Sequence, residues 1–238
     1  MSEKIRLERV SKGFTLEQGK DFKINKYRIG KIIELCKKYK AKRILDVGCA
    51  DGVLTQAMTA HFRGIHAIDG SEELISRARR NCTKATFHCA MFEDFFPDGR
   101  YDMVIAGHIL EHVKSPTTLL RHIRKNWLTE GGKIIVTVPN KESFHRRLGV
   151  EMGMIGDLGE LSKNDLDVGH RRYFSIKTLR ATVARSGFKV LEGGGIMLKP
   201  LSNVQMLDWS DEILDGLNRL SRNIPPEFCG EIYVVARS

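Results

Sequence analysis

Side chains typical of metal ligands are concentrated in one short segment, His108-Ile-Leu-Glu-His112. On a helical turn, positions i, i+3 and i+4 face the same side, so His108, Glu111 and His112 are expected to converge. A further histidine, His170, lies 58 residues beyond His112 in the segment Gly-His-Arg-Arg-Tyr-Phe-Ser. Two imidazoles and a carboxylate from one turn form half of a metal site, and His170 could complete it. Three imidazoles and one carboxylate would favour Mn, Fe, Co, Ni or Zn over Mg, which prefers oxygen ligands.

The same segment is open to two other interpretations. Without a metal, His108 or His112 could act as a general base, because an imidazole changes its protonation state near neutral pH. Alternatively, these side chains could be structural and only orient the loop that carries them. The residue pattern by itself leaves the metal site, the metal-free base and the structural role open.

A second candidate site lies where an apolar run meets a glycine turn, in Arg43-Ile-Leu-Asp-Val-Gly-Cys-Ala-Asp-Gly-Val-Leu-Thr55. The pattern predicts a buried strand, a tight turn and a helix. Gly48 can take a positive φ, and its missing Cβ lets a ligand lie against the backbone. The turn also aims the free N–H groups of a helix N-terminus at that ligand. Asp46, just before the first glycine, suits a ligand with a cationic group.

A second acid follows one strand later. Asp69 ends the run Gly-Ile-His-Ala-Ile-Asp, about 20 residues beyond the turn, where an acidic side chain usually holds a ribose diol. A dinucleotide fingerprint would need Gly-x-Gly-x-x-Gly, but position 50 is alanine and position 53 is valine. The spacing Asp-x-Gly-x-x-x-Gly therefore disfavours a dinucleotide oxidoreductase.

The glycine turn and the two acids resemble motifs I and II of the class I S-adenosylmethionine (SAM) methyltransferases. The resemblance runs from about residue 40 to the C-terminus and implies that SAM is the cofactor. It also implies adenine contacts from the turn after the third strand, although that turn could instead only fill the core. The implied cofactor-binding residues are Asp46, Gly48, Cys49, Gly52, Asp69, Gly70, Ala90, Met91 and Phe92.

The histidine segment resembles the Glu-x-x-Glu-His pattern, followed by a distant His, of two methyltransferase groups. One group comprises the RNA 3′-terminal 2′-O-methyltransferases, and the other comprises the ubiquinone-biosynthesis O-methyltransferases. In those enzymes a divalent metal holds the paired oxygens of the substrate beside the methyl donor. This chain departs at the first ligand, where His108 stands in place of Glu. The resemblance implies metal ligands His108, Glu111, His112 and His170, with His108 and His112 as the candidate catalytic residues.

Hydrophobic periodicity predicts strands and helices that alternate along the chain. Strands are expected at 44–47, up to 69, and at 85–89, 101–107, 133–139, 187–191 and 231–237. Helices are expected from 24, 54 and 72 onward, and at 116–127, 175–186 and 203–221. The resemblance implies an α/β fold: a seven-stranded Rossmann-like sheet, mostly parallel with an antiparallel last strand, and helices on both faces.

Length and charge suggest how the chain is organised. The 238 residues suit one α/β domain, and the net charge of +10 is concentrated at the start, where residues 1–43 hold 14 Lys/Arg against 5 Asp/Glu. We expect a basic N-terminal helical cap over 1–40 and a methyltransferase domain over 41–238. Residues 140–172 are too long for an ordinary connection and are interpreted as a lid over the substrate.

The remaining composition bears on location and partners. The charged first residues indicate no signal peptide, and the apolar runs are shorter than the ~20 residues of a membrane span. Five cysteines without a Cys-x-x-Cys spacing suggest reduced thiols in a cytoplasmic protein. We expect methyl transfer to a hydroxyl oxygen of a small-molecule or glycosidic acceptor, which could be anionic. The alternatives are an RNA 2′-O-methyltransferase, for which no stacking platform is evident, and a non-catalytic SAM-binding regulatory protein. Peripheral membrane contact by the lid stays open.

Overall fold

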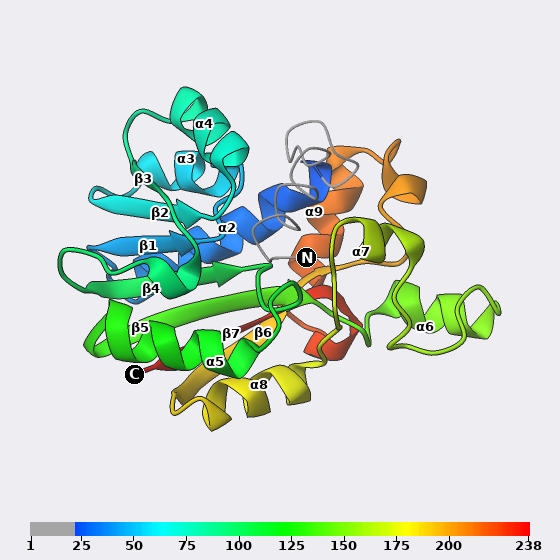
Figure 1. Ribbon diagram of the computed structural model, residues 1–238. Helices are drawn as coiled ribbons and strands as arrows, with labels where there is room; N and C mark the ends of the chain where they lie inside the picture. Colours follow the sequence, from blue (N-terminus) through cyan, green and yellow to red (C-terminus); the bar gives the residue numbers. More distant parts are fainter. Residues whose placement is uncertain (1–21) are drawn as a thin grey trace.

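The computed structural model describes residues 22–238 (Figure 1). Its centre is a seven-stranded sheet with the order β3-β2-β1-β4-β5-β7-β6, in which β7 runs antiparallel to both β5 and β6 and the other pairs are parallel. The sheet predicted from the sequence is therefore confirmed. The strands are β1 Ile44–Val47, β2 Ile65–Asp69, β3 Thr86–Cys89, β4 Tyr101–Gly107, β5 Leu128–Pro139, β6 Lys189–Leu198 and β7 Cys229–Arg237.

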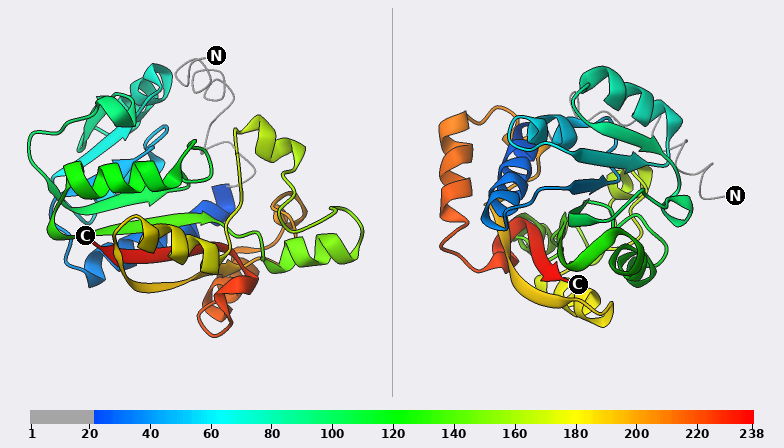
Figure 2. Two further views of the ribbon diagram at one scale, coloured as in Figure 1. Left: turned by 60° about the horizontal axis from the view of Figure 1, so that its bottom comes forward. Right: turned by 90° about the vertical axis from the view of Figure 1, so that its left-hand side faces the viewer.

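Helices cover both faces of the sheet, as Figure 2 shows. Side chains of α5 and α8 pack with one face, and side chains of α2, α3 and α9 pack with the other. The helices are α2 Phe22–Lys38, α3 Val53–Thr59, α4 Glu72–Asn81, α5 Pro116–His122, α6 Phe144–Glu151, α7 Lys163–Asp167, α8 Ile176–Arg185 and α9 Asp211–Leu220. No helix in residues 22–238 is long and apolar enough to cross a membrane.

The strands alternate between two apolar layers, as expected for a sheet buried on both faces. In β1, Leu45 and Val47 belong to the layer under α5 and α8, whereas Ile44 belongs to the layer under α2. Asp46 has the same parity as Ile44, so a buried acid is placed at the carboxyl edge of the sheet beside the glycine turn. The sheet thus fixes the position of the first candidate cofactor residue.

The basic cap is described only in part. Residues 1–21 of the cap expected over 1–40 lie outside the described residues. The described helix α2 buries Tyr27, Ile32 and Leu35 in the same layer as residues of β4 and β5. Helix α2 therefore packs on the sheet, as its apolar spacing predicted, and its first turns lie at the carboxyl edge of the strands.

Serines begin several of the helices where the sequence predicted a start. The Ser71 hydroxyl accepts a hydrogen bond from the Leu74 N–H at 3.4 Å, and Ser175 begins α8 with a reciprocal capping box to Thr178. The helix predicted over 203–221 is wrong in one respect. Ser210 has an extended backbone, so a short 3₁₀ turn at Val204–Met206 precedes a separate helix α9.

The antiparallel direction of β7 brings an additional acid to the functional edge of the sheet. Glu231 pairs in register with Pro139, at the carboxyl end of β5. Because β7 runs opposite to β5, the start of β7 lies where the parallel strands end. Glu231 therefore lies beside the segment that follows β4.

Candidate active site

The glycine turn after β1 is a compact loop tied to the end of β2. The N–H groups of Gly48 and Cys49 both donate to the Ile68 carbonyl oxygen, at 2.8 and 3.1 Å. Gly48 and Gly52 have φ of 72° and 86°, and Ala50 also lies in the left-handed region at 48°. These three positive φ angles bend the chain back toward α3 and leave the loop backbone facing the carboxyl edge.

Both glycines of the turn are required by close packing. A Cβ on Gly48 would lie 2.7 Å from Ile109 Cδ1, and a Cβ on Gly52 would lie 3.0 Å from the Ala78 Cβ of α4. Side chains at these positions would push apart the turn, the segment after β4 and helix α4. The glycine spacing seen in the sequence therefore has a packing cause as well as a conformational one.

Asp46 is buried below this turn, and its Oδ2 accepts a hydrogen bond from the Thr55 hydroxyl at 2.7 Å. Burial raises the pKa of Asp46 to about 6, with a further contribution from the nearby Asp69 carboxylate, against the opposing effect of the Thr55 hydrogen bond. The carboxyl group lines a cavity at the edge of the sheet. An ionised Asp46 would pair with a cationic group placed in that cavity.

Asp69 holds the loop from the neighbouring strand. Its Oδ2 accepts from the Ala50 N–H and its Oδ1 from the Ser71 N–H, each at 3.0 Å. The Asp69 carbonyl oxygen accepts from the Ala90 N–H at 3.1 Å, so the predicted adenine turn lies against the same strand end. Residues 90–92 are half-buried. The roles assigned to Asp69, Gly70 and residues 90–92 stay predictions.

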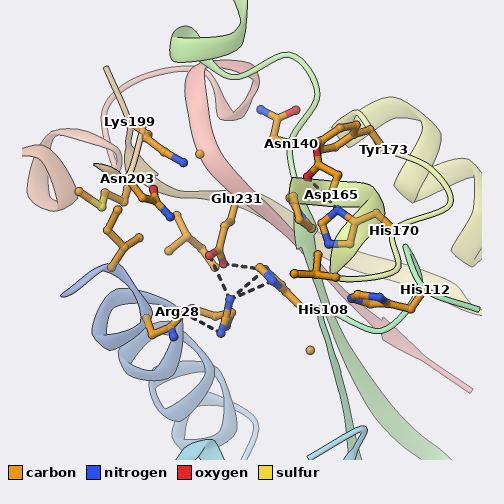
Figure 3. Close-up of a pocket in the computed structure, with 18 of the residues that line it drawn as sticks. Arg28, His108, His112, Asn140, Asp165, His170, Tyr173, Lys199, Asn203 and Glu231 are labelled. Carbon is orange, nitrogen blue, oxygen red and sulfur yellow. Dashed lines mark hydrogen bonds and ion pairs between the residues drawn. The ribbon is translucent and has the colours of Figure 1, made fainter. Parts of the chain in front are cut away.

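A cavity of about 300 Å³ opens at the carboxyl edge of the sheet (Figure 3). One wall is the glycine turn after β1, called the cofactor loop below for its predicted role, with Asp46, Gly48 and Cys49. The other walls come from α2, the segment after β4, the predicted lid, the residues after β6 and the start of β7. In that order they contribute Arg28; His108 and His112; Asp165 and His170; Lys199; and Glu231. Helix α2 and the lid therefore enclose, together with the sheet edge, the space beside the predicted cofactor site.

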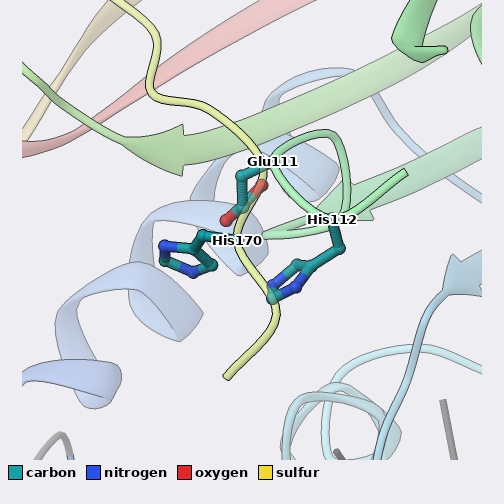
Figure 4. Close-up of side chains that lie close together, drawn as sticks. All are labelled: Glu111, His112 and His170. Atoms are coloured by element: carbon teal, nitrogen blue, oxygen red, sulfur yellow. The ribbon is translucent and has the colours of Figure 1, made fainter. Parts of the chain in front are cut away.

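Three of the four predicted metal ligands converge at this cavity (Figure 4). Ligand atoms of Glu111, His112 and His170 all lie within 4.8 Å of one another, and the two imidazole rings are 4.8 Å apart at 72°. Glu111 is 1% exposed, and within the described part of the chain neither of its carboxylate oxygens has a hydrogen-bond partner. A buried carboxylate costs free energy unless it is paired or binds a metal. The donor set of two imidazoles and one carboxylate fits a transition metal or zinc.

His108 is not part of this cluster, so the predicted helical turn from 108 to 112 is wrong at its first residue. The turn runs over Ile109–Val113, where the Val113 N–H donates to the Ile109 carbonyl oxygen at 3.3 Å. His108 itself has a φ of 52° and lies outside the cluster of Glu111, His112 and His170. The i, i+3, i+4 geometry therefore holds for neither pair that includes His108, although its Nδ1 lies 3.8 Å from Glu111.

The His108 ring instead lies between a cation and an anion, as Figure 3 shows. Arg28 Nη1 is 3.0 Å from Nδ1, and Glu231 Oε2 is 3.1 Å from Nε2. Arg28 Nη1 also lies 3.1 Å from Nε2, and because a guanidinium can only donate, the ring nitrogen that accepts from it carries a lone pair. Both ring nitrogens are then engaged. Arg28 also donates to Glu231 Oε1 at 3.1 Å, which closes the triad.

The pKa values of these groups follow from burial and neighbouring charge. Burial alone would raise the pKa of Glu231, but His108 and Arg28 hold it at about 2. Burial lowers the pKa of His112 to about 4, against the opposing effect of the Glu111 carboxylate. His112 is therefore neutral at physiological pH, which is the form that binds a metal or accepts a proton.

Two arginines join the lid to the segment after β4. Arg171 Nε donates to the His112 carbonyl oxygen at 2.8 Å, and the Arg171 N–H donates to the Glu111 carbonyl oxygen at 2.8 Å. The Arg172 guanidinium donates to the carbonyl oxygens of Leu110, Val113 and Lys114. These bonds hold His170 next to residues 58 positions earlier in the sequence. Sequence reasoning missed this clamp, and its one local signal is the Arg-Arg pair beside His170.

Arg28 and Glu231 are the other site residues that sequence reasoning missed. Arg28 was one of many basic residues in the predicted cap, and Glu231 was one acid at the start of a predicted strand. Only the packing of α2 and the antiparallel direction of β7 bring them to the cavity.

A sheet with the β7 reversal, a glycine loop after β1 and acids at the ends of β1 and β2 define a class I SAM-dependent methyltransferase. Residues 23–192 match the family model described as "Methyltransferase domain", so the chain belongs to this family.

The chain is also similar to individual proteins that are named as methyltransferases. The chain is 28% identical over 185 residues to a ubiquinone biosynthesis O-methyltransferase of Coxiella burnetii, with 76% of this chain and 77% of that protein covered. It is 27% identical to the protein of the same name from Hydrogenovibrio crunogenus, with coverage of 78% and 77%. Among solved structures, a SAM-dependent methyltransferase of Thermotoga maritima, described as a possible histamine N-methyltransferase, shares the fold with a TM-score of 0.67, 16% identity and coverage of 97% and 99%.

Proposed function

We propose that this enzyme transfers the methyl group of SAM to a hydroxyl oxygen of a small acceptor, with a divalent metal bound by Glu111, His112 and His170. Relatives named ubiquinone biosynthesis O-methyltransferases, at 27–28% identity over about three quarters of the chain, support transfer to oxygen. The observation that carries the metal is the buried Glu111 carboxylate, whose two oxygens lack hydrogen-bond partners among the described residues while two imidazoles lie within 4.8 Å.

The charges around the cofactor loop match the methionine end of SAM. Asp46 lies below the loop and would pair with the ammonium group. Arg28 lines the same cavity and lies close enough to Asp46 to affect its pKa, so its guanidinium could bind the carboxylate. Asp69 would hold the ribose hydroxyls, and residues 90–92 would border the adenine. This orientation directs the methyl group from the loop toward the interior of the cavity.

Methyl transfer by SN2 attack needs the acceptor oxygen in line with the S–CH₃ bond, so positioning supplies much of the rate. When bound, the metal would lower the pKa of the acceptor hydroxyl and hold it in place. Neutral His112 is in the protonation state that ligation requires. His108, predicted as a catalytic residue, has both ring nitrogens engaged and is better suited to fixing Arg28 and Glu231.

A metal-free mechanism is the main alternative for the same reaction. His112 lines the cavity and is neutral at physiological pH, so its ring could accept the proton of the acceptor. A pKa of about 4 makes it a weak base. Methyl transfer with His112 as a metal-free base would therefore be slower than transfer to a metal-bound acceptor. It would also leave the Glu111 carboxylate without a hydrogen-bond partner among the described residues.

The cavity suits a small polar acceptor. Beyond the cluster its lining is rich in hydrogen-bonding groups, including Asn140, Lys199 and Asn203. Lys199 would favour an acceptor with an anionic group. A space of about 300 Å³ fits one small molecule, although a single nucleotide of an RNA could also enter it. The lid also exposes the apolar side chains of Met152, Met154 and Leu166, which could contact a membrane surface peripherally.

Labelled SAM tests this function directly. We expect the purified enzyme to methylate a component of a small-molecule extract, to lose at least about 90% of that activity in EDTA, and to regain it with Mn, Fe, Co, Ni or Zn better than with Mg. Full activity in EDTA would reject the metal and leave His112 as the base. Label in RNA would favour the 2′-O alternative. Tight SAM binding in calorimetry with no labelled product from either pool would favour a regulatory protein.

A further inference from the structure

The cavity is lined by a buried carboxylate, that of Asp165, which lies next to the Nδ1 side of the proposed metal ligand His170. Asp165 is 7% exposed, and its Oδ1 lies 3.1 Å from His170 Nδ1 (Figure 3). The Asp165 carbonyl oxygen also accepts from the His170 N–H at 2.7 Å. The same residue, five positions earlier in the lid, therefore faces the ring of His170 and accepts a hydrogen bond from its backbone.

The second carboxylate oxygen of Asp165 is occupied elsewhere. Its Oδ2 accepts from the Ser162 N–H at 2.7 Å and from the Ser162 hydroxyl at 2.5 Å, while the Asp165 N–H donates to that hydroxyl at 3.2 Å. This is the capping box of helix α7. Because the cap fixes Oδ2, the carboxylate cannot rotate freely, and Oδ1 stays directed at His170.

We propose that Asp165 is a positioning residue that holds His170 in the Nδ1–H tautomer and thereby directs the Nε2 lone pair toward Glu111 and His112. An imidazole has two nitrogens, and a neutral ring carries a proton on only one of them. With a carboxylate facing Nδ1, the proton belongs on Nδ1, since two acceptors would otherwise face each other. Nε2 is then free to bind a metal, and the carboxylate also increases its basicity. This inference rests on the proposed metal site.

The arrangement also explains how a lid residue could complete a metal site without a local motif. Helix α7 fixes Asp165 through its cap, Asp165 fixes the His170 ring, and Arg171 ties the next residue to His112. His170 is thus restrained from two sides. A ligand held this way loses little conformational freedom when a metal binds.

Asp165→Asn separates positioning from helix capping. The amide oxygen can still accept from the Ser162 N–H, while the amide NH₂ would face His170 Nδ1 and favour the Nε2–H tautomer, which has no lone pair for a metal. We expect the affinity for Co²⁺, measured by titration of its visible spectrum, to fall by about 10–100-fold. We also expect the spectrum of the bound ion to change, because one nitrogen ligand is lost. The melting temperature should stay close to that of the native enzyme.

Two control variants test the structural explanation. Ser162→Ala removes the cap hydroxyl but leaves the carboxylate facing His170, so the enzyme should melt earlier while Co²⁺ affinity stays within about threefold. Asp167→Asn removes an exposed carboxylate from the same helix and should change neither quantity. Equal losses of Co²⁺ affinity in Ser162→Ala and Asp165→Asn would overturn the proposal in favour of simple lid folding.

A metal-free readout distinguishes this proposal from the proposed function. Long-range ¹H–¹⁵N correlation NMR, with His170→Ala to assign the ring, should show the Nδ1–H tautomer in the native enzyme and a shift toward Nε2–H in Asp165→Asn. An unchanged tautomer would overturn the positioning role even if the native enzyme binds Co²⁺ tightly. A native enzyme with the expected tautomer but no Co²⁺ binding would instead reject the metal in the proposed function, and with it the role of Asp165 toward a metal.

Discussion

The two sides of the cavity differ in how their acids are satisfied. On the cofactor side, both Asp69 oxygens accept backbone N–H bonds and Asp46 accepts the Thr55 hydroxyl. On the acceptor side, Asp165 and Glu231 also accept hydrogen bonds, but the buried Glu111 has no such bond among the described residues. The acids of the first side are therefore hydrogen-bonded within the protein itself. The second retains one buried carboxylate that lacks a hydrogen-bond partner among the described residues, which is the condition expected of a site that is completed by binding.

The two sides also differ in how far their parts are separated along the chain. The cofactor loop, the end of β2 and the start of α4 fall within residues 46–71, so their contacts form between neighbouring segments. The acceptor side joins residues 108–114 to 165–172 and to Glu231. These long-range contacts depend on the arginine clamp and on the antiparallel β7. The comparison predicts that mutations on the two sides will separate cofactor binding from catalysis.

The largest separation is expected for Arg172→Ala. The guanidinium donates to three carbonyl oxygens between residues 110 and 114, so its loss should loosen the loop that carries Glu111 and His112. A shift of about 1 Å in catalytic groups can cost about 100-fold in rate, and we expect a loss of that order in kcat. The SAM dissociation constant, measured by calorimetry, should stay within about twofold.

Arg180→Ala is the matched control for this prediction. Arg180 is exposed on α8, and its guanidinium donates a long hydrogen bond of 3.4 Å to the Gly193 carbonyl oxygen. Its loss should leave kcat unchanged. If Arg172→Ala weakened SAM binding as much as it slowed turnover, the two sides would not be separable and the comparison would be wrong.

The opposite pattern is expected for Asp69→Ala. Removal of this carboxylate should weaken SAM binding by about 1–3 kcal/mol, the usual contribution of hydrogen bonds to a charged group. Co²⁺ binding at the acceptor side should not change. Asp94→Ala, in an exposed acid a short distance along the chain, is the control. Unchanged SAM affinity in a folded Asp69→Ala variant would reject the ribose assignment.

The cofactor side could be predicted from the sequence because its signals are local. The glycine spacing, Asp46, Asp69 and the Ser71 cap each lie in one short segment, and the structure places them together. The acceptor side was predicted only as a set of residue types. The helical spacing brought His108 in with Glu111 and His112, but a left-handed φ at His108 breaks that turn. Backbone conformation at one residue cannot be read from ligand spacing.

The contributions of α2 and β7 to the site were unpredictable for a related reason. Arg28 and Glu231 are 203 residues apart and meet over His108 only because two distant elements pack at the same edge. Neither residue belongs to a motif with its own spacing. Charged side chains of this kind are usually solvated, so the sequence offers no reason to select them.

A smaller effect is expected from pH on the cofactor side. Asp46 must be ionised to pair with the SAM ammonium group, and its pKa in the free enzyme is raised by burial to about 6. Below pH 6 the free enzyme carries a proton that binding must release, so SAM affinity should fall by about fivefold from pH 6 to pH 5 and change little from pH 7 to pH 6.5. Asp46→Asn should bind SAM more weakly and without this slope. A native affinity that is constant from pH 5 to 7 would contradict the pairing.

The smallest effect is expected for His108→Asn, at the boundary between the two sides. His108 has a φ of 52°, a conformation that asparagine tolerates better than most residues, so the backbone should be preserved. The ring holds Arg28 and Glu231, but these two also contact each other directly at 3.1 Å, so most of the triad should survive. We therefore expect kcat to fall by less than about tenfold, because a positioning contact and not a base is lost. His112→Asn should lose far more in the same assay. A loss in His108→Asn as large as in His112→Asn would restore His108 as a catalytic residue and show that its ring leaves Arg28 when substrate binds.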